Sequence, residues 1–245
     1  MHGRGEARLG SYTIRFDPRD QVIGKHLALY GSYEPLESAA FLALIRPGDE
    51  VLDAGANIGV YTLLLSGAVG SGRVIAVEPD PTNLEFLRQN VARNACANVT
   101  VVPCALGGET RQVGLSQDPR NRGALCVTDA QAPGAVGVPM RRAADVLREL
   151  RARPRVMKLD VEGAEPDVLA GLDELPDVLM FEFTPEQLRR QGHDPLGFLR
   201  WVTGRGYALE MIHPATGDRI AGAAEQLLSW AVELRRDVNL IALRG

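Results

Sequence analysis

Three carboxylates lie at or just after the ends of two predicted buried strands, where α/β enzymes commonly hold reactive groups. Asp160 ends the strand expected at 156–160, Glu162 follows it, and Glu182 lies near the end of the strand expected at 178–183. Because the carboxyl ends of neighbouring parallel strands meet at one edge of a sheet, we expect Asp160 and Glu182 to face the same cleft. Two carboxylates so placed either share a proton, which raises one pKa, or hold a divalent metal ion. All three are therefore candidate catalytic residues.

The residues around Asp160 have simpler structural interpretations. Lys158 is expected to pair with a neighbouring acid. Glu165 is expected to begin a helix, where its charge interacts favourably with the helix dipole. Successive strand residues face opposite ways, so Glu162 joins Asp160 in the cleft only if the strand ends between them, as the following Gly163 indicates.

A glycine-containing turn supplies the strongest candidate for a cofactor site. Gly55 and Gly59 let the chain turn sharply without side chains in the way, so a ligand can approach the backbone. Asp53, at the end of the preceding strand, can accept a hydrogen bond from an ammonium group, whereas a pyrophosphate site would avoid a carboxylate there. A dinucleotide fingerprint, G-x-G-x-x-G, would need glycine in place of Asn57. With Ala56, this turn fits a nucleoside carrying an amino acid better than one carrying phosphates.

Four further residues extend this predicted cofactor site. Glu78 ends the next strand about 20 residues after the glycines, where related folds hold the acid that binds both ribose hydroxyls. Its alternative role is that of a solvated acid at a strand end. Pro79 follows it in the turn. Cys104 and Ala105, after the third strand, are small residues that suit a flat slot for a base.

Side chains outside the strand ends provide other candidates. His193 and His213, both in predicted loops, are alternative proton acceptors because imidazole titrates near neutral pH. In the N-terminal segment, His26 and Tyr30, with Glu34 behind them, are expected to close over a bound cofactor.

The order of the predicted elements explains how these residues meet. Strand, glycine-rich turn, helix, strand, helix and strand follow one another over 50–102, which is typical of a parallel, doubly wound sheet. We expect an α/β fold with a Rossmann-like, mostly parallel seven-stranded sheet and helices on both faces. Residues 1–46 are interpreted as an N-terminal extension or lid helix, and 47–245 as the catalytic domain. A β-rich insertion at about 107–139 is expected to form a flap that contacts the substrate. Farther along, Thr184 and Gln187 have the spacing of a capping box.

The composition narrows the class of protein. The 245 residues, 45% hydrophobic and 24% charged, suit one compact domain. A net charge of -4 gives no electrostatic attraction to nucleic acid or to an anionic membrane. Three cysteines without a CxxC pair argue against a disulfide scaffold or a zinc site. No apolar run approaches the roughly 20 residues of a membrane span, and the N-terminus lacks the core of a signal peptide. We expect a cytoplasmic monomer or homodimer that acts on a small molecule.

The motifs together resemble the FkbM family of methyltransferases. The resemblance rests on the Asp53–Gly59 turn, the Glu78–Pro81 turn, Ala105–Gly107 and Glu182, and most specifically on Lys158–Glu165, a stretch that methyltransferases at large do not share. It implies a class I methyltransferase fold that uses S-adenosylmethionine. Methyl transfer in this family usually goes to a hydroxyl of a macrolide, a sugar or another specialised metabolite. A divalent metal held by Asp160 and Glu182 is the alternative to the metal-free mechanism that we favour.

Two other interpretations stay open at this point. An NAD(P)-dependent oxidoreductase shares the strand, the turn and Glu78, but its glycine spacing differs. A cofactor-binding module without catalytic activity is the second, although the carboxylates Asp160, Glu162 and Glu182 argue against it. A serine hydrolase is excluded because no G-x-S-x-G segment is present.

Overall fold

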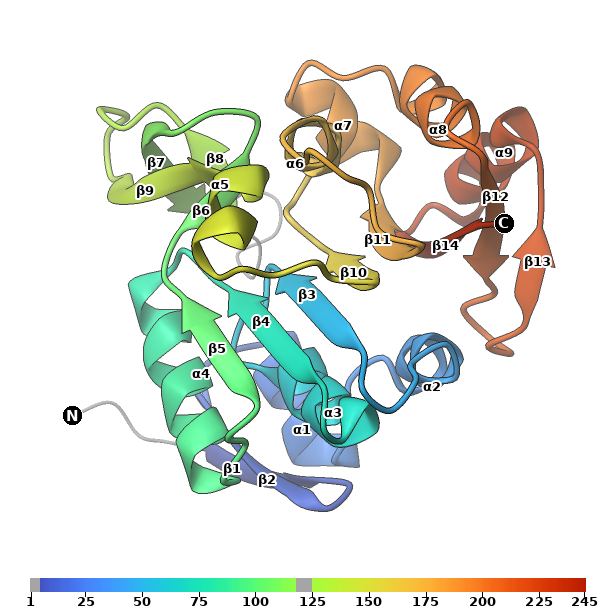
Figure 1. The fold of residues 1–245 in the computed structure, drawn as a ribbon. Helices are drawn as coiled ribbons and strands as arrows, with labels where there is room; N and C mark the ends of the chain where they lie inside the picture. The colour runs from blue at the N-terminus through green and yellow to red at the C-terminus, as the bar shows by residue number, and fades with distance from the viewer. Residues whose placement is uncertain (1–4, 118–124) are drawn as a thin grey trace.

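In the computed structural model, which describes residues 5–117 and 125–245, an eight-stranded sheet forms the centre of the molecule (Figure 1). Its strands lie in the order β13 (Arg219–Ala221), β12 (Tyr207–Ile212), β14 (Val238–Arg244), β11 (Val178–Phe183), β10 (Val156–Leu159), β3 (Glu50–Ala54), β4 (Arg73–Val77) and β5 (Val99–Val102). From β11 to β5 all pairings are parallel, whereas β14 is antiparallel to both β11 and β12. The expected α/β class with a mostly parallel sheet is confirmed. The count of seven strands is wrong by one, because β13 is a three-residue edge strand, too short to show a strand period.

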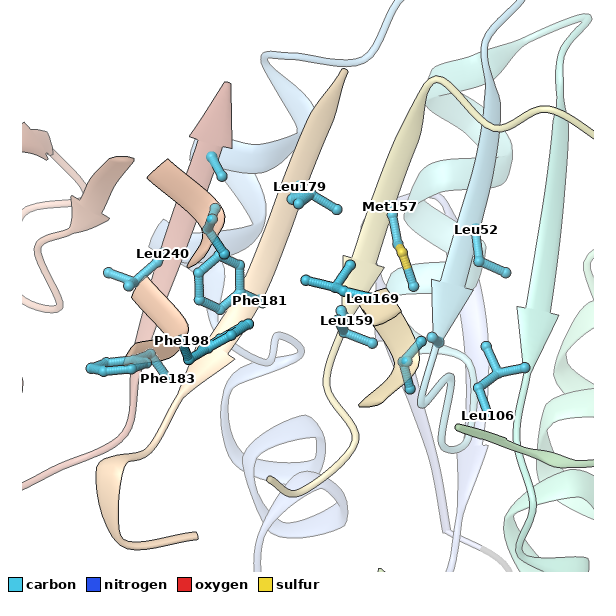
Figure 2. Packing of buried hydrophobic residues seen from close by; sticks show 14 of the residues in the cluster. Leu52, Leu106, Met157, Leu159, Leu169, Leu179, Phe181, Phe183, Phe198 and Leu240 are labelled. Carbon is cyan, nitrogen blue, oxygen red and sulfur yellow. The ribbon is translucent and has the colours of Figure 1, made fainter. Parts of the chain in front are cut away.

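Helices cover both faces of this sheet because successive apolar residues of its central strands point to opposite faces and both faces must be buried. The helices are α1 (Ile23–Tyr30), α2 (Pro35–Leu42), α3 (Val60–Val69), α4 (Pro81–Arg93), α5 (Ala143–Glu149), α6 (Glu165–Ala170), α7 (Pro185–Arg190), α8 (Pro195–Thr203) and α9 (Ala224–Leu234). Val51 and Met180 pack on one face with Phe41 of α2 and Tyr61 of α3. On the other face, a cluster that includes residues of α5, α6, α8 and α9 surrounds side chains such as Leu52 (Figure 2). Every helix in the described parts of the chain is too short or too polar to span a bilayer.

The N-terminal segment is more than the helix expected over 1–46. Strands β1 (Gly5–Leu9) and β2 (Tyr12–Phe16) form an antiparallel hairpin. The Asn90 side chain of α4 accepts a hydrogen bond from Arg15 N at 2.7 Å and donates to Arg15 O at 2.9 Å and Ile58 O at 2.8 Å. One buried amide therefore joins the hairpin to α4 and to the turn after β3.

A second sheet interrupts the alternation after β5. Strands β6 (Ala105–Gly107), β9 (Val136–Arg142), β7 (Arg111–Gln117) and β8 (Leu125–Thr128) lie side by side in that order. This sheet lies in the part of the chain where the sequence predicts a β-rich flap, although residues 118–124 of that segment are outside the described residues. It stands beside α6, as Figure 1 shows, so it borders the carboxyl edge of the large sheet.

Candidate active site

The turn after β3 has a backbone that only glycine permits at its tightest point. Gly55 has φ +81°, and a Cβ there would lie 1.8 Å from the carbonyl oxygen of Asp160. The N–H groups of Gly55 and Ala56 both donate to Val77 O at 3.0 Å, and Asp160 N donates to Ala54 O at 3.0 Å. The turn is therefore fixed between β4 and the loop that follows β10. Figure 1 shows β3, β4 and β10 side by side.

Asp53 presents a buried oxygen that has no partner. Its side chain is fully buried, and its Oδ2 accepts a hydrogen bond from Thr62 Oγ1 at 2.6 Å, whereas its Oδ1 is without a hydrogen bond. Burial raises the pKa of Asp53, and Lys158 and the Thr62 hydroxyl oppose this rise. A buried carboxylate oxygen left without a donor is costly unless a ligand supplies one. Asp53 is thus suited to bind a cationic group of a cofactor.

Glu78 links the turn to the start of α4. Its Oε2 accepts from Asn57 N at 2.8 Å and its Oε1 from Asp80 N at 2.8 Å. Burial raises the pKa of Glu78 to about 7, although these backbone hydrogen bonds lower it. Since a carboxylate has about four acceptor sites, both oxygens keep capacity for ligand hydroxyls. Pro79 lies in the connection that these bonds tie down.

The remaining cofactor candidates, Cys104, Ala105 and Gly59, have ordinary packing roles. Cys104 is 1% exposed within the main apolar cluster, and burial raises its thiol pKa to about 11. Ala105 is buried at the start of β6, and Gly59, with φ +94°, begins α3 against Leu87. These small side chains are compatible with the predicted base slot.

The N-terminal segment brings Glu34 to the site but not Tyr30. Glu34 stands at the start of α2, where its Oε2 accepts from Tyr61 Oη at 2.8 Å. Burial raises the pKa of Glu34, and Lys158 opposes this rise. Tyr30 is 71% exposed on α1, and its ring lies 5.9 Å from that of His26. The expectation that Tyr30 and His26 close over a cofactor has no contact in this structure to support it.

Tyr33 is the aromatic residue that the sequence analysis missed. Burial is the largest cause that raises the pKa of Tyr33, and the nearby charges of Glu34, Asp160, Glu182 and Glu162 raise it further. Its hydroxyl therefore keeps its proton and can donate a hydrogen bond beside the carboxylates. Its ring meets that of His26 edge-on at 5.9 Å. The signal available in the sequence was its place directly before Glu34.

The three candidate catalytic carboxylates come together. Because β10 ends at Leu159, both Asp160 and Glu162 reach the cluster, and Glu162 has a left-handed φ of +58°. Burial and then the charge of Asp160 raise the pKa of Glu162 to about 8. The same two causes raise the pKa of Glu182 far above its ordinary value, and Glu182 Oε2 is buried without a hydrogen bond. We call Asp160, Glu162 and Glu182 the carboxylate cluster.

Glu165 stabilises the loop that carries Asp160 and Glu162, two members of this cluster. Its Oε1 accepts hydrogen bonds from Val161 N at 3.1 Å and Gly163 N at 3.3 Å. The side chain is 1% exposed, and burial raises its pKa to about 7 against those backbone bonds. Its contacts support the helix-start interpretation and add a structural role in shaping the loop.

The predicted capping box at the start of α7 is wrong. The Thr184 hydroxyl makes no cap bond and donates to Asp237 Oδ1 at 2.8 Å. Gln187 Nε2 donates to Glu162 Oε2 instead of reaching back to the helix start. The two polar side chains are drawn to acids that are distant in sequence, and Gln187 thereby orients one member of the carboxylate cluster.

Lys158 makes the expected pair with a neighbouring acid. Its Nζ lies 2.9 Å from Asp160 Oδ2 and 4.7 Å from the centroid of the Tyr61 ring. Although burial lowers the pKa of Lys158, the charges of Asp160, Asp53 and Glu34 raise it above the ordinary lysine value. Lys158 is therefore a fully charged, buried ammonium group between the turn and the carboxylate cluster.

Comparison with known proteins identifies the family. Residues 53–209 match the methyltransferase FkbM domain, which covers more than half of the chain and includes both the turn and the carboxylate cluster. The chain belongs to the FkbM methyltransferase family.

Relatives of this FkbM domain agree with that assignment. "Methyltransferase 1" of Beauveria bassiana (strain ARSEF 2860) is 31% identical over 145 residues, 51% of this chain and 58% of the relative. "Methyltransferase sdnD" of Sordaria araneosa is 30% identical over 58% of this chain and 69% of its own length. "31-O-demethyl-FK506 methyltransferase FkbM" of Streptomyces tacrolimicus is 30% identical over 53% of this chain and 62% of its own. The chain thus covers between 58% and 69% of the length of these three relatives.

Solved structures support the fold. The fibrillarin pre-rRNA processing protein of Methanococcus jannaschii superposes with a TM-score of 0.50 at 12% identity, over 86% of this chain and 76% of that protein. The likeness extends to the fold alone, which is that of class I methyltransferases.

The two histidine candidates, His193 and His213, lie outside the carboxylate cluster. His193 Nε2 is 3.2 Å from Asp167 Oδ2 of α6. His213 Nδ1 accepts from Ala215 N at 3.4 Å in the turn before β13. These contacts bring neither imidazole to Asp160.

Within residues 5–117 and 125–245, no group of three or more His, Cys, Asp or Glu side chains is arranged to hold a metal ion.

Two cavities lie near opposite ends of the parallel strands. The larger, about 740 Å³, includes Asp177 before β11 and Arg244 at the end of β14, so it lies at the opposite edge of the sheet. A smaller cavity of about 350 Å³ lies between the second sheet and α6, with Arg111, Asp167 and Gln191 in its lining. The smaller cavity is next to the loop that carries Asp160 and Glu162.

Proposed function

We propose that this chain is an S-adenosylmethionine-dependent O-methyltransferase that methylates a hydroxyl of a small molecule. The observation that carries the proposal is the junction of two loops at one sheet edge. The turn with its unpartnered Asp53 oxygen touches, through Gly55, the backbone of Asp160. A cofactor-binding turn and a carboxylate cluster are thereby in contact, which methyl transfer to a hydroxyl requires.

The residues of the turn fit S-adenosylmethionine. Asp53 Oδ1 is available to an ammonium group, and Glu78 keeps acceptor sites for ribose hydroxyls. From the sequence, Gly55 and Gly59 are expected to let a ligand approach the backbone, and Ala105 is expected to line the slot for the base. When bound, the sulfonium supplies an electrophilic methyl group, so the protein has to align the acceptor and remove one proton.

Asp160 is our candidate for the proton acceptor. An aliphatic hydroxyl, with a pKa near the roughly 15.7 of water, needs a base or a metal to react. Asp160 stands at the end of β10 and is paired with a cation. Burial and the charge of Asp160 raise the pKa values of Glu162, to about 8, and of Glu182. The hydroxyl proton is thus expected to pass to Asp160, with the two glutamates as its hydrogen-bonding surroundings.

The acceptor class rests on two lines of support. Two relatives have names that specify their acceptors, "31-O-demethyl-FK506 methyltransferase FkbM" and "Hexuronic acid methyltransferase AglP" of Haloferax volcanii, the second 29% identical over 51% of this chain. The cavity of about 350 Å³ beside α6 is lined by polar groups that suit hydroxylated ligands. We infer a macrolide, a sugar or another specialised metabolite.

The test is methyl transfer to candidate acceptors. The purified chain is incubated with S-adenosylmethionine carrying a tritiated methyl group and a panel of hydroxylated metabolites, and products are analysed by mass spectrometry. We expect a mass gain of one methylene on a hydroxyl, which is lost in Asp160→Asn and kept in the surface control Glu174→Gln. Methylation of nitrogen or carbon alone would contradict O-methylation, and cofactor binding without transfer to any acceptor would favour the inactive module.

Two more measurements separate the alternatives. Calorimetry with NAD and S-adenosylmethionine distinguishes an oxidoreductase from a methyltransferase, and we expect heat only with the second. Treatment with EDTA decides the metal question. Complete, magnesium-reversible loss of turnover would reject the metal-free version and would point to Asp160 and Glu182 as the ligands.

We also infer a cytoplasmic location. Its support is the pair of free, buried thiols at Cys96 and Cys104, which suit a reducing compartment. Fractionation of the source cells with an antibody against the chain tests this inference.

A further inference from the structure

Lys158 is the buried cation of the site. It is 3% exposed, and among residues 5–117 and 125–245 no other lysine or arginine is buried to this degree. An ammonium group is placed in such an environment at high cost unless acids compensate it. Its location therefore calls for an explanation beyond the stability of the fold.

Three separate parts of the chain face this ammonium group. Lys158 on β10 is level with Asp53 on β3 in a parallel pairing, so both side chains lie on the same face of the sheet. The Tyr61 ring of α3 lies under its Nζ, and Tyr61 in turn donates to Glu34. Asp160, from the loop after β10, completes the group. Lys158 thus faces the cofactor turn, the N-terminal segment and the carboxylate cluster.

Of the three acids around Lys158, only Asp160 receives its hydrogen bond. The Lys158 Nζ to Asp160 Oδ2 distance is 2.9 Å, while Asp53 Oδ1 keeps no partner. The charges of Asp160, Asp237 and Glu165 raise the pKa values of both Glu162 and Glu182. The Lys158 ammonium therefore binds one carboxylate, Asp160, of a cluster whose acidic side chains otherwise repel one another.

We propose that Lys158 is a positioning residue that holds the Asp160 carboxylate in place within the carboxylate cluster through the 2.9 Å contact of its Nζ with Asp160 Oδ2. The pair fixes Oδ2 and leaves Oδ1 as the acceptor of the hydroxyl proton, and Lys158 keeps all of its own protons. The catalytic part of this inference rests on the proposed function, because that function gives Asp160 its role. The pairing itself does not depend on it.

The sequence offers a direct spectroscopic test. Lys25 and Lys158 are the only two lysines of the chain, so protein labelled with carbon-13 at lysine Cε gives two lysine signals. Lys25→Arg removes one of them and assigns the other to Lys158. In a pH titration we expect the Lys158 signal of the unmutated chain to stay in its charged position beyond the range of an exposed lysine. Asp160→Asn should shift that signal and bring its titration to lower pH, since burial then opposes the charge with one acid fewer.

Turnover supplies the second readout. Lys158→Met should lower turnover about 10²-fold or more, the usual contribution of a correctly charged acid or base, with cofactor affinity nearly unchanged. The acid limb of its pH–rate profile should move to higher pH. Lys158→Arg keeps the charge and should restore part of the turnover, and the exposed-residue control Lys25→Met should leave both properties unchanged. A merely structural lysine would lower stability without moving the pH profile.

The outcomes separate this inference from the proposed function. If Asp160→Asn leaves the Lys158 signal and its titration unchanged, the pairing inference is overturned, whatever the chain methylates. If the signal responds but no hydroxyl is methylated, the pairing stands and the proposed function fails. If Lys158→Met folds and turns over normally at every pH, the positioning role is rejected.

Discussion

The loops that follow β3 and β10 have similar backbones and opposite chemistry. Each contains glycine with positive φ, Gly55 at +81° and Gly163 at +96°, beside a non-glycine residue in the left-handed region, Asn57 or Glu162. The first loop directs its backbone N–H groups to fixed acceptors, Val77 O and Glu78. The second directs carboxylates toward one another.

The difference shows what each loop depends on. The turn after β3 is determined by the absence of side chains, so its geometry follows from which residues are glycine. The loop after β10 depends on how its acids are paired, Asp160 with Lys158 and Glu162 with Gln187, and on their burial. Steric constraints determine the first loop and electrostatic interactions the second, so substitutions in the two loops should affect different properties of the protein.

The largest effect should come from Gly55→Ala. The new Cβ would meet Asp160 O at 1.8 Å, so the two loops would have to separate, and we expect little or no folded protein. Gly48→Ala is the matched control, because Gly48 also has a positive φ, +91°, but a Cβ there meets nothing within 4 Å. It should cost only the left-handed strain of about 1–2 kcal/mol. Urea denaturation of both variants gives the measurement, and equal stability of the two would show that the loops do not constrain each other.

The carboxylate cluster should respond in its chemistry and not in its fold. Asp160→Asn should lower turnover about 10²–10⁴-fold while the affinity for S-adenosylmethionine stays nearly unchanged. Glu182→Gln should have a much smaller effect at neutral pH, because an amide resembles the protonated form that the raised pKa favours. Turnover and calorimetry are measured on the same preparations. If neither substitution changes turnover, His193 or His213 becomes the leading candidate for the base.

The turn should respond in cofactor affinity. Glu78→Ala removes the acceptor expected for ribose hydroxyls, at about 1.5–3 kcal/mol for a hydrogen bond to a charged group, which corresponds to a loss of roughly 10- to 100-fold. Since the pKa of Glu78 is about 7, affinity in the unmutated chain should also fall as the pH is lowered through 7 and the carboxylate is protonated. Calorimetry at several pH values tests both statements. Unchanged affinity in the variant would remove Glu78 from the ribose site.

The smallest effect concerns stability and pH. In the folded chain the pKa values of Glu78, Glu165 and Glu162 are about 7, 7 and 8, all above the ordinary glutamate value of about 4.3 in the unfolded chain. Their ionisation therefore opposes folding at high pH, and stability should rise as the pH falls from about 8.5 to 6. We expect Tm to be higher at pH 6 by a few degrees, since 1 kcal/mol corresponds to about 2–4 °C at this size. Glu165→Gln should weaken this dependence, whereas Glu174→Gln should leave it as it is.

Much of the fold was predictable because its signals are local. The central strands are buried and bounded by turn residues, and β11 has the predicted limits of 178–183. The side chains of Asp80 and Asp194 cap α4 and α8. Such a cap is expected where an aspartate precedes a proline at the first position of a helix. The hairpin β1–β2 and the strand β13 were missed because they are short and depend on partners distant in sequence, such as Asn90 for β2.

The site divides in the same way. By itself the sequence determined the turn of Gly55 and Gly59 and the positions of Asp53, Glu78, Asp160 and Glu182 at strand ends, because strand ends and glycine turns are local features. Only the tertiary structure decided that Tyr33 faces the cluster while Tyr30 is exposed, and that Gln187 binds Glu162 instead of capping a helix. It also decided that burial and neighbouring charge raise the pKa values of Glu162 and Glu182. Charge states depend on burial and on the distances between residues remote in sequence, and neither exists until the chain has folded.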